Sequence, residues 1–160
     1  MIGIEVYEML EQVCSSHDAY YDVMDCDALR FVRVPKFPMA LVVNTRPAPE
    51  SGHWIAFYMR DEYSPIEFFD TFKMPPEVYN NNFVPFMRRM SHQILDMPRT
   101  IQCQDSAFCG HHCINYINSR LQRKSIEYIY TKIFSPGCRN KDTSSKRFVN
   151  SMKPKRFVHY

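Results

Sequence analysis

The spacing of apolar residues predicts four amphipathic helices along the chain. In each of them, apolar side chains recur every three or four residues, as on the buried face of a helix. The predicted helices cover residues 2–14, 83–95, 109–124 and 126–133. The breaker segment Ser135-Pro136-Gly137 ends the last one.

Three short strands are predicted between the first two helices. Residues 39–45 form an apolar run rich in β-branched side chains, residues 53–59 alternate between two faces, and residues 65–72 carry Asp70 near their end. Short polar segments join these runs, which favours an antiparallel meander. Residues 20–38 show no regular pattern, and we expect loop and short extended pieces there. The prediction is an α+β fold in which a central, mostly antiparallel sheet packs against helices.

Length and composition limit the class of protein. The 160 residues are enough for one domain with its own core, and 45% hydrophobic content excludes wholesale disorder. The chain lacks the run of about 20 apolar residues that a membrane helix needs, and its N-terminus does not resemble a signal peptide. We therefore expect a monomeric protein of a reducing compartment, neither secreted nor membrane-bound, with its six cysteines as free thiols.

The positive charge is concentrated at the C-terminal end. Residues 139–160 contain seven basic residues and one acidic residue, a net charge of +6, so the rest of the chain carries −3 of the total of +3. We predict a single domain over residues 1–138 and a basic tail over residues 139–160. Such a tail favours contact with a polyanion, nucleic acid being the obvious one, although a solvated tail that keeps the protein soluble is an equal alternative.

Cys109 lies where a polar turn runs into the third predicted helix. Asp105 and Ser106, just upstream, are residue types that cap the first turn of a helix. A thiol at this end of a helix is favoured as a thiolate by the helix dipole. Taken alone, however, a cysteine is more often a small buried apolar residue without reactivity.

His53 and Asp70 lie at the ends of two neighbouring predicted strands. In an antiparallel pair the start of one strand lies beside the end of the next, so the imidazole and the carboxylate can meet at one edge of the sheet. Two of the four glycines, Gly52 and Gly110, adjoin His53 and Cys109. They indicate a substrate path, since glycine permits close approach, or they simply make a turn and a helix entry.

These residues supply the groups that a cysteine protease needs. Cys109 would be the nucleophile, His53 the general base and later the acid, and Asp70 the group that orients the imidazole. Gln102 could donate its side-chain amide to the oxyanion beside the backbone amide of Cys109. This chemistry requires no cofactor.

A metal site is the sharpest alternative use of the same segment. Cys103, Cys109, His111, His112 and Cys113 are all potential ligands within a short span. Structural zinc sites use two spaced ligand pairs, and the second pair is not evident here. We therefore predict no metal, and we expect His111 and His112 to be partly exposed.

The ordered set resembles the adenovirus-type cysteine endopeptidases. The motifs are Asn44-Thr45, Gly52-His53-Trp54, Phe68-Phe69-Asp70, and Gln102 through Ser106 to Cys109-Gly110 and Cys113. They cover about half the chain, residues 38–120. The family includes adenain and the proteases of Polinton/Maverick-type elements and related viruses, within the papain-like clan. More distantly, the set is similar to the SUMO-specific and other ubiquitin-like-protein proteases.

The resemblance implies His53, Asp70 and Cys109 as a catalytic triad and Gln102 as the oxyanion residue. Gln102 lies seven residues before Cys109, the adenain-type interval, whereas the competitor Gln104 lies five before it. Trp54 resembles the tryptophan that lines a narrow cleft suited to glycine-containing sites; the less favoured alternative is a core aromatic residue of a strand.

The implied function is cleavage of viral precursor polypeptides during virion maturation, in the virion and in the nucleus or cytoplasm of the host cell. The alternatives are a ubiquitin-like-protein protease or deubiquitinase, and a non-catalytic binding module on the same fold.

The chain also departs from the adenoviral pattern. It has Asp70 where adenoviral members often have Glu, and it is shorter than they are. Those enzymes are activated by DNA and by a peptide that forms a disulfide with the enzyme. No cysteine here is a clear counterpart, since Cys103, Cys14, Cys26 and Cys138 qualify only by elimination. Activation by DNA or by a peptide cofactor is therefore an open expectation.

Overall fold

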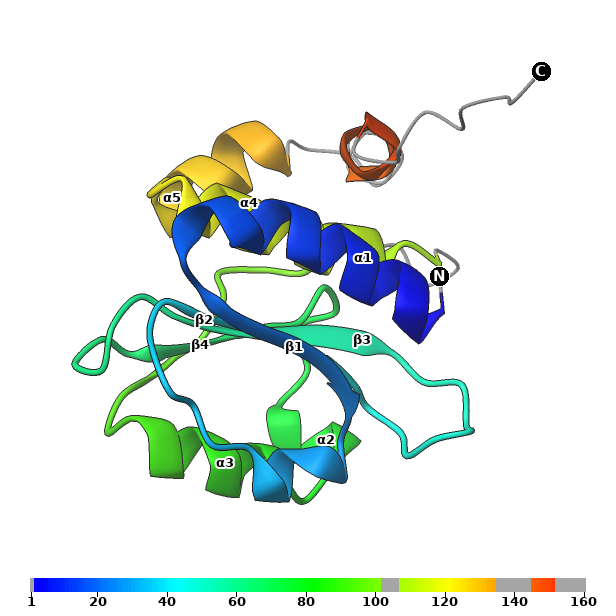
Figure 1. The fold of residues 1–160 in the computed structure, drawn as a ribbon, viewed down its shortest axis with the longest axis vertical. Coiled ribbons are helices and arrows are strands. Elements are labelled where there is room, and N and C mark those ends of the chain that lie inside the picture. Colours follow the sequence, from blue (N-terminus) through cyan, green and yellow to red (C-terminus); the bar gives the residue numbers. More distant parts are fainter. Residues whose placement is uncertain (1, 102–106, 135–144, 152–160) are drawn as a thin grey trace.

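A five-stranded sheet lies between two layers of helices in the computed structural model, which describes residues 2–101, 107–134 and 145–151 (Figure 1). The strands are β1 (Tyr20–Asp25), β2 (Met39–Asn44), β3 (Trp54–Met59), β4 (Ile66–Phe69) and β5 (Ile94–Leu95). The helices are α1 (Gly3–Cys14), α2 (Pro76–Tyr79), α3 (Phe83–Met90), α4 (Cys109–Leu121) and α5 (Ile126–Tyr128). Two short 3₁₀-helices, η1 (Ser15–His17) and η2 (Ala28–Phe31), and a π-helical segment, η3 (Ile129–Ile133), complete them.

The order of strands in the sheet follows the order in the chain. Strands β2, β3 and β4 form the predicted antiparallel meander, with Val42 opposite Ala56 and Ala56 opposite Phe69. The two outer strands, β1 and β5, run parallel to their neighbours, so the sheet is mixed. The sequence pattern identified the meander, but it indicated only short extended pieces where β1 lies.

The alternation of side chains along the strands builds two apolar cores. Ala56 and Tyr58 of β3 face the core under α1 and α4, whereas Ile55 and Phe57 face the core above α3 and η2. The two faces of this strand are those predicted from the sequence. Both faces are buried, which explains why the strands read as nearly continuous apolar runs.

Helix α4 is fastened to the sheet by a buried ion pair. Arg120 donates from Nε and Nη2 to the two carboxylate oxygens of Glu67 on β4, both at 2.8 Å. The Tyr116 hydroxyl donates to the same carboxylate, and its ring stacks on Phe69 with centroids 4.2 Å apart. Removing one partner of such a pair would leave a buried charge uncompensated. This arrangement fixes the position of α4 over the strands.

Two predicted helix ends differ from the structure. The helix beginning at Phe83 ends at Met90 rather than near Leu95, because Ser91 turns to an extended conformation and Ile94 and Leu95 pair with β4 as β5. The apolar Ile94 fits the helical spacing, but the edge of β4 offers it a partner. Helix α4 ends at Leu121, three residues earlier than predicted.

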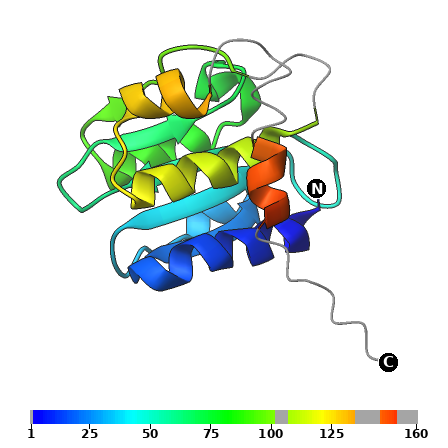
Figure 2. The same cartoon turned by 90° about the horizontal axis from the view of Figure 1, so that it is seen from above.

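Residues 145–151 form a helix beside α4, although the sequence pattern predicted no regular structure from residue 141 onward (Figure 2). Val149 of this helix is fully buried in the core under α1 and α4. The division of the chain at residue 138 stays a prediction.

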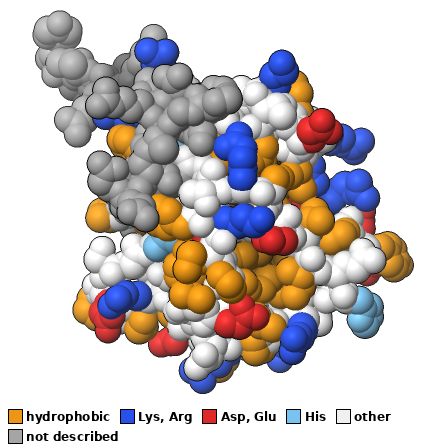
Figure 3. Space-filling model, turned by 180° about the vertical axis from the view of Figure 1, so that it is seen from behind, with side chains coloured by type: hydrophobic (Ala, Val, Ile, Leu, Met, Phe, Trp, Pro, Cys, Tyr) orange, Lys and Arg blue, Asp and Glu red, His pale blue; other side chains and the backbone are white. Residues whose placement is uncertain are grey.

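The surface facing away from the view of Figure 1 is chemically mixed. Hydrophobic side chains gather near its centre, and acidic and basic side chains are interspersed around them (Figure 3). Among the helices that the structure describes, none is both long enough and apolar enough to cross a membrane.

Candidate active site

His53, Asp70 and Cys109 meet at one end of the sheet. His53 directly precedes β3, Asp70 directly follows β4, and Cys109 is the first residue of α4. His53 Nε2 lies 2.7 Å from Asp70 Oδ1. The imidazole is also hydrogen-bonded to the Cys109 side chain. Because Asp70 engages Nε2, we assign this second hydrogen bond to Nδ1. The structure therefore brings together the three residues that the sequence singled out.

Helix α4 reaches this point because the pairing of β3 with β4 stops short of it. The last pair is Ala56 with Phe69, so the backbone of Trp54 has no strand on that side. Its N–H faces the Cys109 sulfur, and its carbonyl accepts from Cys113 Sγ at 3.5 Å. Backbone polar groups in a protein interior need partners. The first turn of α4 supplies them and thereby brings Cys109 beside His53.

Four donors fix the Asp70 carboxylate. His53 and the Phe72 N–H donate to Oδ1, and the Met74 N–H and the Tyr79 hydroxyl donate to Oδ2 at 2.8 and 2.7 Å. Asp70 is 1% exposed, so burial raises its pKa, but these hydrogen bonds outweigh burial and hold the pKa below its ordinary value. The carboxylate is thus an anion with a single orientation.

Opposing influences set the charge of His53. Burial lowers the pKa of the imidazole, but the hydrogen bonds to Asp70 and Cys109, together with their charges, raise it to about 9. The ring lies near Phe72 and Tyr79, with centroids 4.8 and 5.6 Å away. Held in this way, His53 favours the imidazolium form.

The Cys109 thiol has the complementary tendency. Burial raises its pKa, but the hydrogen bond and the charge of His53, followed by the N–H groups of Trp54 and Gly110, lower the pKa below its ordinary value. In contrast, burial raises the pKa of Cys113 well above that value and the pKa of Cys14 to about 12. Among the four described cysteines, all free thiols, the thiolate is favoured at Cys109.

Tyr79 and Phe72 are parts of this site that the sequence reasoning missed. Nothing in their spacing marked them, because the segment after Asp70 was interpreted only as the end of the sheet. The proline-rich start of α2 places Tyr79 within reach of Asp70. The available signal was Asp70 itself, because a carboxylate buried at a strand end needs several hydrogen-bond donors from the residues that follow it.

Gly52 has a structural reason to be glycine. A Cβ at this position would lie 2.1 Å from Asn44 Oδ1 and 3.0 Å from the Arg46 nitrogen. The next residue, His53, donates its N–H to Thr45 Oγ1 at 3.0 Å. Gly52 therefore lets the chain pack against the end of β2 just before His53. Its role, and that of Gly110, in binding a substrate stays a prediction.

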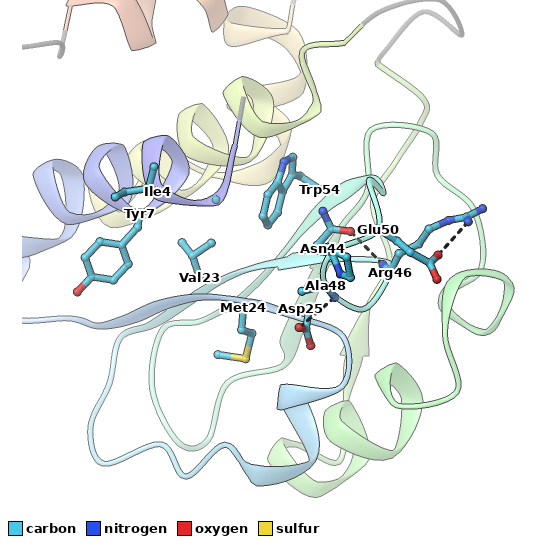
Figure 4. A pocket seen from close by; sticks show the side chains of 12 residues that line it. Ile4, Tyr7, Val23, Met24, Asp25, Asn44, Arg46, Ala48, Glu50 and Trp54 are labelled. Carbon is cyan, nitrogen blue, oxygen red and sulfur yellow. Dashed lines mark hydrogen bonds and ion pairs between the residues drawn. The ribbon is translucent and has the colours of Figure 1, made fainter.

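A pocket of about 490 Å³ opens beside Trp54 (Figure 4). Ile4 and Tyr7 of α1 and Val23 of β1 line it on one side, and the segment from Arg46 to Glu50 lines it on the other. Trp54 is 9% exposed and packs against the core under α1 and α4. Trp54 is therefore a core residue that also borders this pocket. Its role in a substrate cleft stays a prediction.

Several predicted residues lie outside the described part of the chain. Gln102, its competitor Gln104, the potential metal ligand Cys103 and the predicted caps Asp105 and Ser106 are among them. Within residues 2–101, 107–134 and 145–151, no group of three or more His, Cys, Asp or Glu side chains could hold a metal ion. His112 is fully buried, so the prediction that it is partly exposed is wrong.

The fold and the site together define an α+β protein with a thiol at a helix N-terminus, an imidazole beside it and a carboxylate behind the imidazole. Such a set can activate a nucleophile and move its proton. No protein-family model matches the sequence, and no curated protein matches it either.

Solved structures do match the fold. The ASFV pS273R protease superimposes with a TM-score of 0.65 and 18% identity over 92% of this chain and 65% of that protein. Its selenomethionine form gives a TM-score of 0.65 and 17% identity over 93% and 66%. The chain therefore has the fold of that protease and spans about two thirds of its length.

Proposed function

We propose that this chain is a cysteine endopeptidase with Cys109 as nucleophile, His53 as acid and base, and Asp70 as the orienting carboxylate. The contact that carries the proposal is the hydrogen-bonded series Cys109–His53–Asp70, with 2.7 Å between the last two side chains. The likeness of the fold to a viral protease supports it.

The geometry supports a two-step hydrolysis. The Cys109 thiolate adds to the carbonyl carbon of the scissile bond, and His53 gives its proton to the leaving amine as the C–N bond breaks. Water then attacks the resulting thioester, with His53 as base, and the thiolate leaves. Asp70 keeps Nε2 engaged, so that the other ring nitrogen faces the thiol throughout.

The developing oxyanion needs donors, and the start of α4 provides one. The backbone N–H of Cys109 belongs to the first turn of the helix, whose N–H groups have no partners within the helix. We assign the second donor to the Gln102 side chain on the strength of its adenain-type interval from Cys109.

We further propose that the substrates are viral precursor polypeptides cut at glycine-containing sites during virion maturation, as in adenain-type proteases. The support is the sequence resemblance, together with Trp54, which directly follows His53 and borders a pocket lined mainly by α1, β1 and the segment after β2. From the same resemblance we propose that the protein acts in the virion and in the nucleus or cytoplasm of the host cell, and we propose that it acts as a monomer.

DNA and a peptide remain proposed activators. Of the seven basic residues after residue 138, Lys146 and Arg147 lie on the described helix and are exposed. On the face in Figure 3, basic and acidic side chains are interspersed, and we propose the tail as the surface that contacts DNA. Because Cys14 and Cys26 are fully buried, a disulfide to a peptide would need Cys103 or Cys138.

The test is cleavage of a panel of glycine-containing viral junction peptides and ubiquitin-like fusions by the parent, Cys109→Ala and the control Cys14→Ala. We expect the parent and the control to cut viral junctions and Cys109→Ala to cut nothing. Cleavage by Cys109→Ala would refute the mechanism. Cleavage of ubiquitin-like fusions alone would refute the viral-substrate assignment. Binding without cleavage would identify a binding module, and DNA added at low and high salt would test the polyanion contact.

A further inference from the structure

The helix of residues 145–151 lies beside the first turns of α4 (Figure 2). Val149 is fully buried, and Phe148 packs against the same core. A segment that the sequence assigned to a solvated basic tail is thus partly inside the protein.

A buried polar cluster connects this helix to α4. Ser145 Oγ lies 2.8 Å from Nδ1 of His112 and accepts from Asn115 Nδ2 at 3.2 Å. All three residues are buried, with at most 5% of any of them exposed. Buried polar groups are costly when unpaired, so these side chains depend on one another. Ser145 therefore links positions three and six residues after Cys109.

A second contact reaches the residue immediately before Cys109. The Lys146 ammonium lies 5.5 Å from the centre of the Phe108 ring, within the range of a cation–π interaction. Phe108 meets His111 edge-on, with centroids 5.2 Å apart. The contacts of Ser145 and Lys146 thus bracket Cys109 on both sides along the chain.

We infer that the helix of residues 145–151 fixes the position of the first turns of α4, and that Ser145 and Lys146 are positioning residues for Cys109. The Arg120–Glu67 pair fixes the opposite end of α4. The reactivity of Cys109 depends on its hydrogen bond to His53, so a shift of this end of α4 changes the thiol directly. The inference rests on the proposed role of Cys109 but on no particular substrate.

The first experiment compares Lys146→Met with Arg147→Met in the full chain. Each change removes one positive charge from an exposed position of the same helix, but Lys146 is the one over the Phe108 ring. The measurement is the rate of alkylation of Cys109 by iodoacetamide as a function of pH, with the site identified by peptide mapping. We expect Lys146→Met to slow alkylation at neutral pH about two- to fivefold, as for loss of an exposed cation–π contact. Arg147→Met should match the parent.

The second experiment compares Ser145→Ala with Ser151→Ala. Ser151 is exposed and bonds only within its own helix, to the Phe148 carbonyl. We expect Ser145→Ala to move the midpoint of alkylation to higher pH and to slow it about tenfold at neutral pH, the size expected for loss of a buried hydrogen-bond partner. A role confined to stability would lower the Tm and leave the midpoint unchanged, which would overturn the inference for Ser145. If Ser145→Ala does not fold, the Lys146 and Arg147 pair decides.

These outcomes are separable from those of the proposed function. If the parent cleaves peptides and both Ser145→Ala and Lys146→Met keep the parent's alkylation profile, the inference is wrong and the peptidase stands. If no peptide is cleaved but the profiles change as expected, the inference stands and the peptidase proposal fails.

Discussion

Replacing Asp70 by Asn would remove the charge behind His53 while keeping the shape of the side chain. An amide has a single oxygen, whereas the carboxylate accepts two hydrogen bonds on each of its oxygens. Two of the four donors would then face an NH₂ group. Both effects weaken the hold on the imidazole.

The size of the effect follows from the pKa of His53. A value of about 9 against an ordinary 6.5 corresponds to about 3 kcal/mol in favour of the imidazolium. This is the net result of burial, which lowers the pKa, and of the hydrogen bonds and charges of Asp70 and Cys109, which raise it. Because Cys109 shares in this effect, losing about half of this free energy with Asp70 would reduce kcat/KM about tenfold. The Cys109 thiolate would lose its charged partner, so its pKa should return toward the ordinary value of 9.0.

The assay is the pH dependence of Cys109 alkylation, run beside peptide cleavage. Asp61→Asn makes the same chemical change on the turn at the other end of β3 and serves as the control. We expect the alkylation midpoint to rise in Asp70→Asn and to stay constant in Asp61→Asn. An unchanged midpoint and rate in Asp70→Asn would refute the coupling of Asp70 to Cys109 through His53.

Asp70→Asn should also change how the stability of the folded protein depends on pH in the acid range. Because the folded-state pKa of Asp70 is lowered, its contribution to stability is fully present above the ordinary value of 3.8 and is lost as the pH falls through the folded-state value. The stability difference between the parent and Asp70→Asn should therefore shrink below pH 3.8 in urea unfolding experiments. A constant difference across this range would contradict the lowered pKa.

Two further substitutions test the scaffold of the site. Gly52→Ala should cost about 1–3 kcal/mol by overpacking and reduce cleavage, whereas Gly3→Ala, whose Cβ would meet nothing nearer than 3.9 Å, should be tolerated; equal unfolding midpoints in urea would argue against this. Arg120→Met should cost about 3 kcal/mol by leaving the Glu67 charge unpaired, while the exposed Arg123→Met should be neutral, as measured by thermal unfolding.

The sequence was sufficient to predict the three central strands of the sheet and the proximity of His53 and Asp70. Strand alternation and short connections determine an antiparallel meander, and the meander determines which strand ends are adjacent. The approach of Cys109 did not follow from spacing in the same way. It depends on where the pairing of β3 with β4 stops, because beyond that point the Trp54 backbone is hydrogen-bonded to α4 rather than to a strand.

Other features depend on contacts between distant segments and leave little trace in a local pattern. Strand β5 is two residues long and forms by pairing with the outer edge of β4. The helical spacing that includes Ile94 therefore wrongly predicted that α3 continues to Leu95. Tyr79 joins the site through its hydroxyl on Asp70 and its ring beside His53. Ser145 lies in a stretch whose composition indicates a basic tail, and its burial arises from His112 and Asn115 on α4.

The most direct test of the peptidase proposal is to map the covalent adduct formed with a glycine-terminated peptide vinyl methyl ester, which places an electrophilic carbon where the scissile carbonyl would lie. We predict one adduct per chain, on Cys109, absent in Cys109→Ala and formed more slowly in Asp70→Asn. An adduct on another cysteine, or equal labelling of the parent and Asp70→Asn, would contradict the assignment of Cys109, His53 and Asp70 as one catalytic unit.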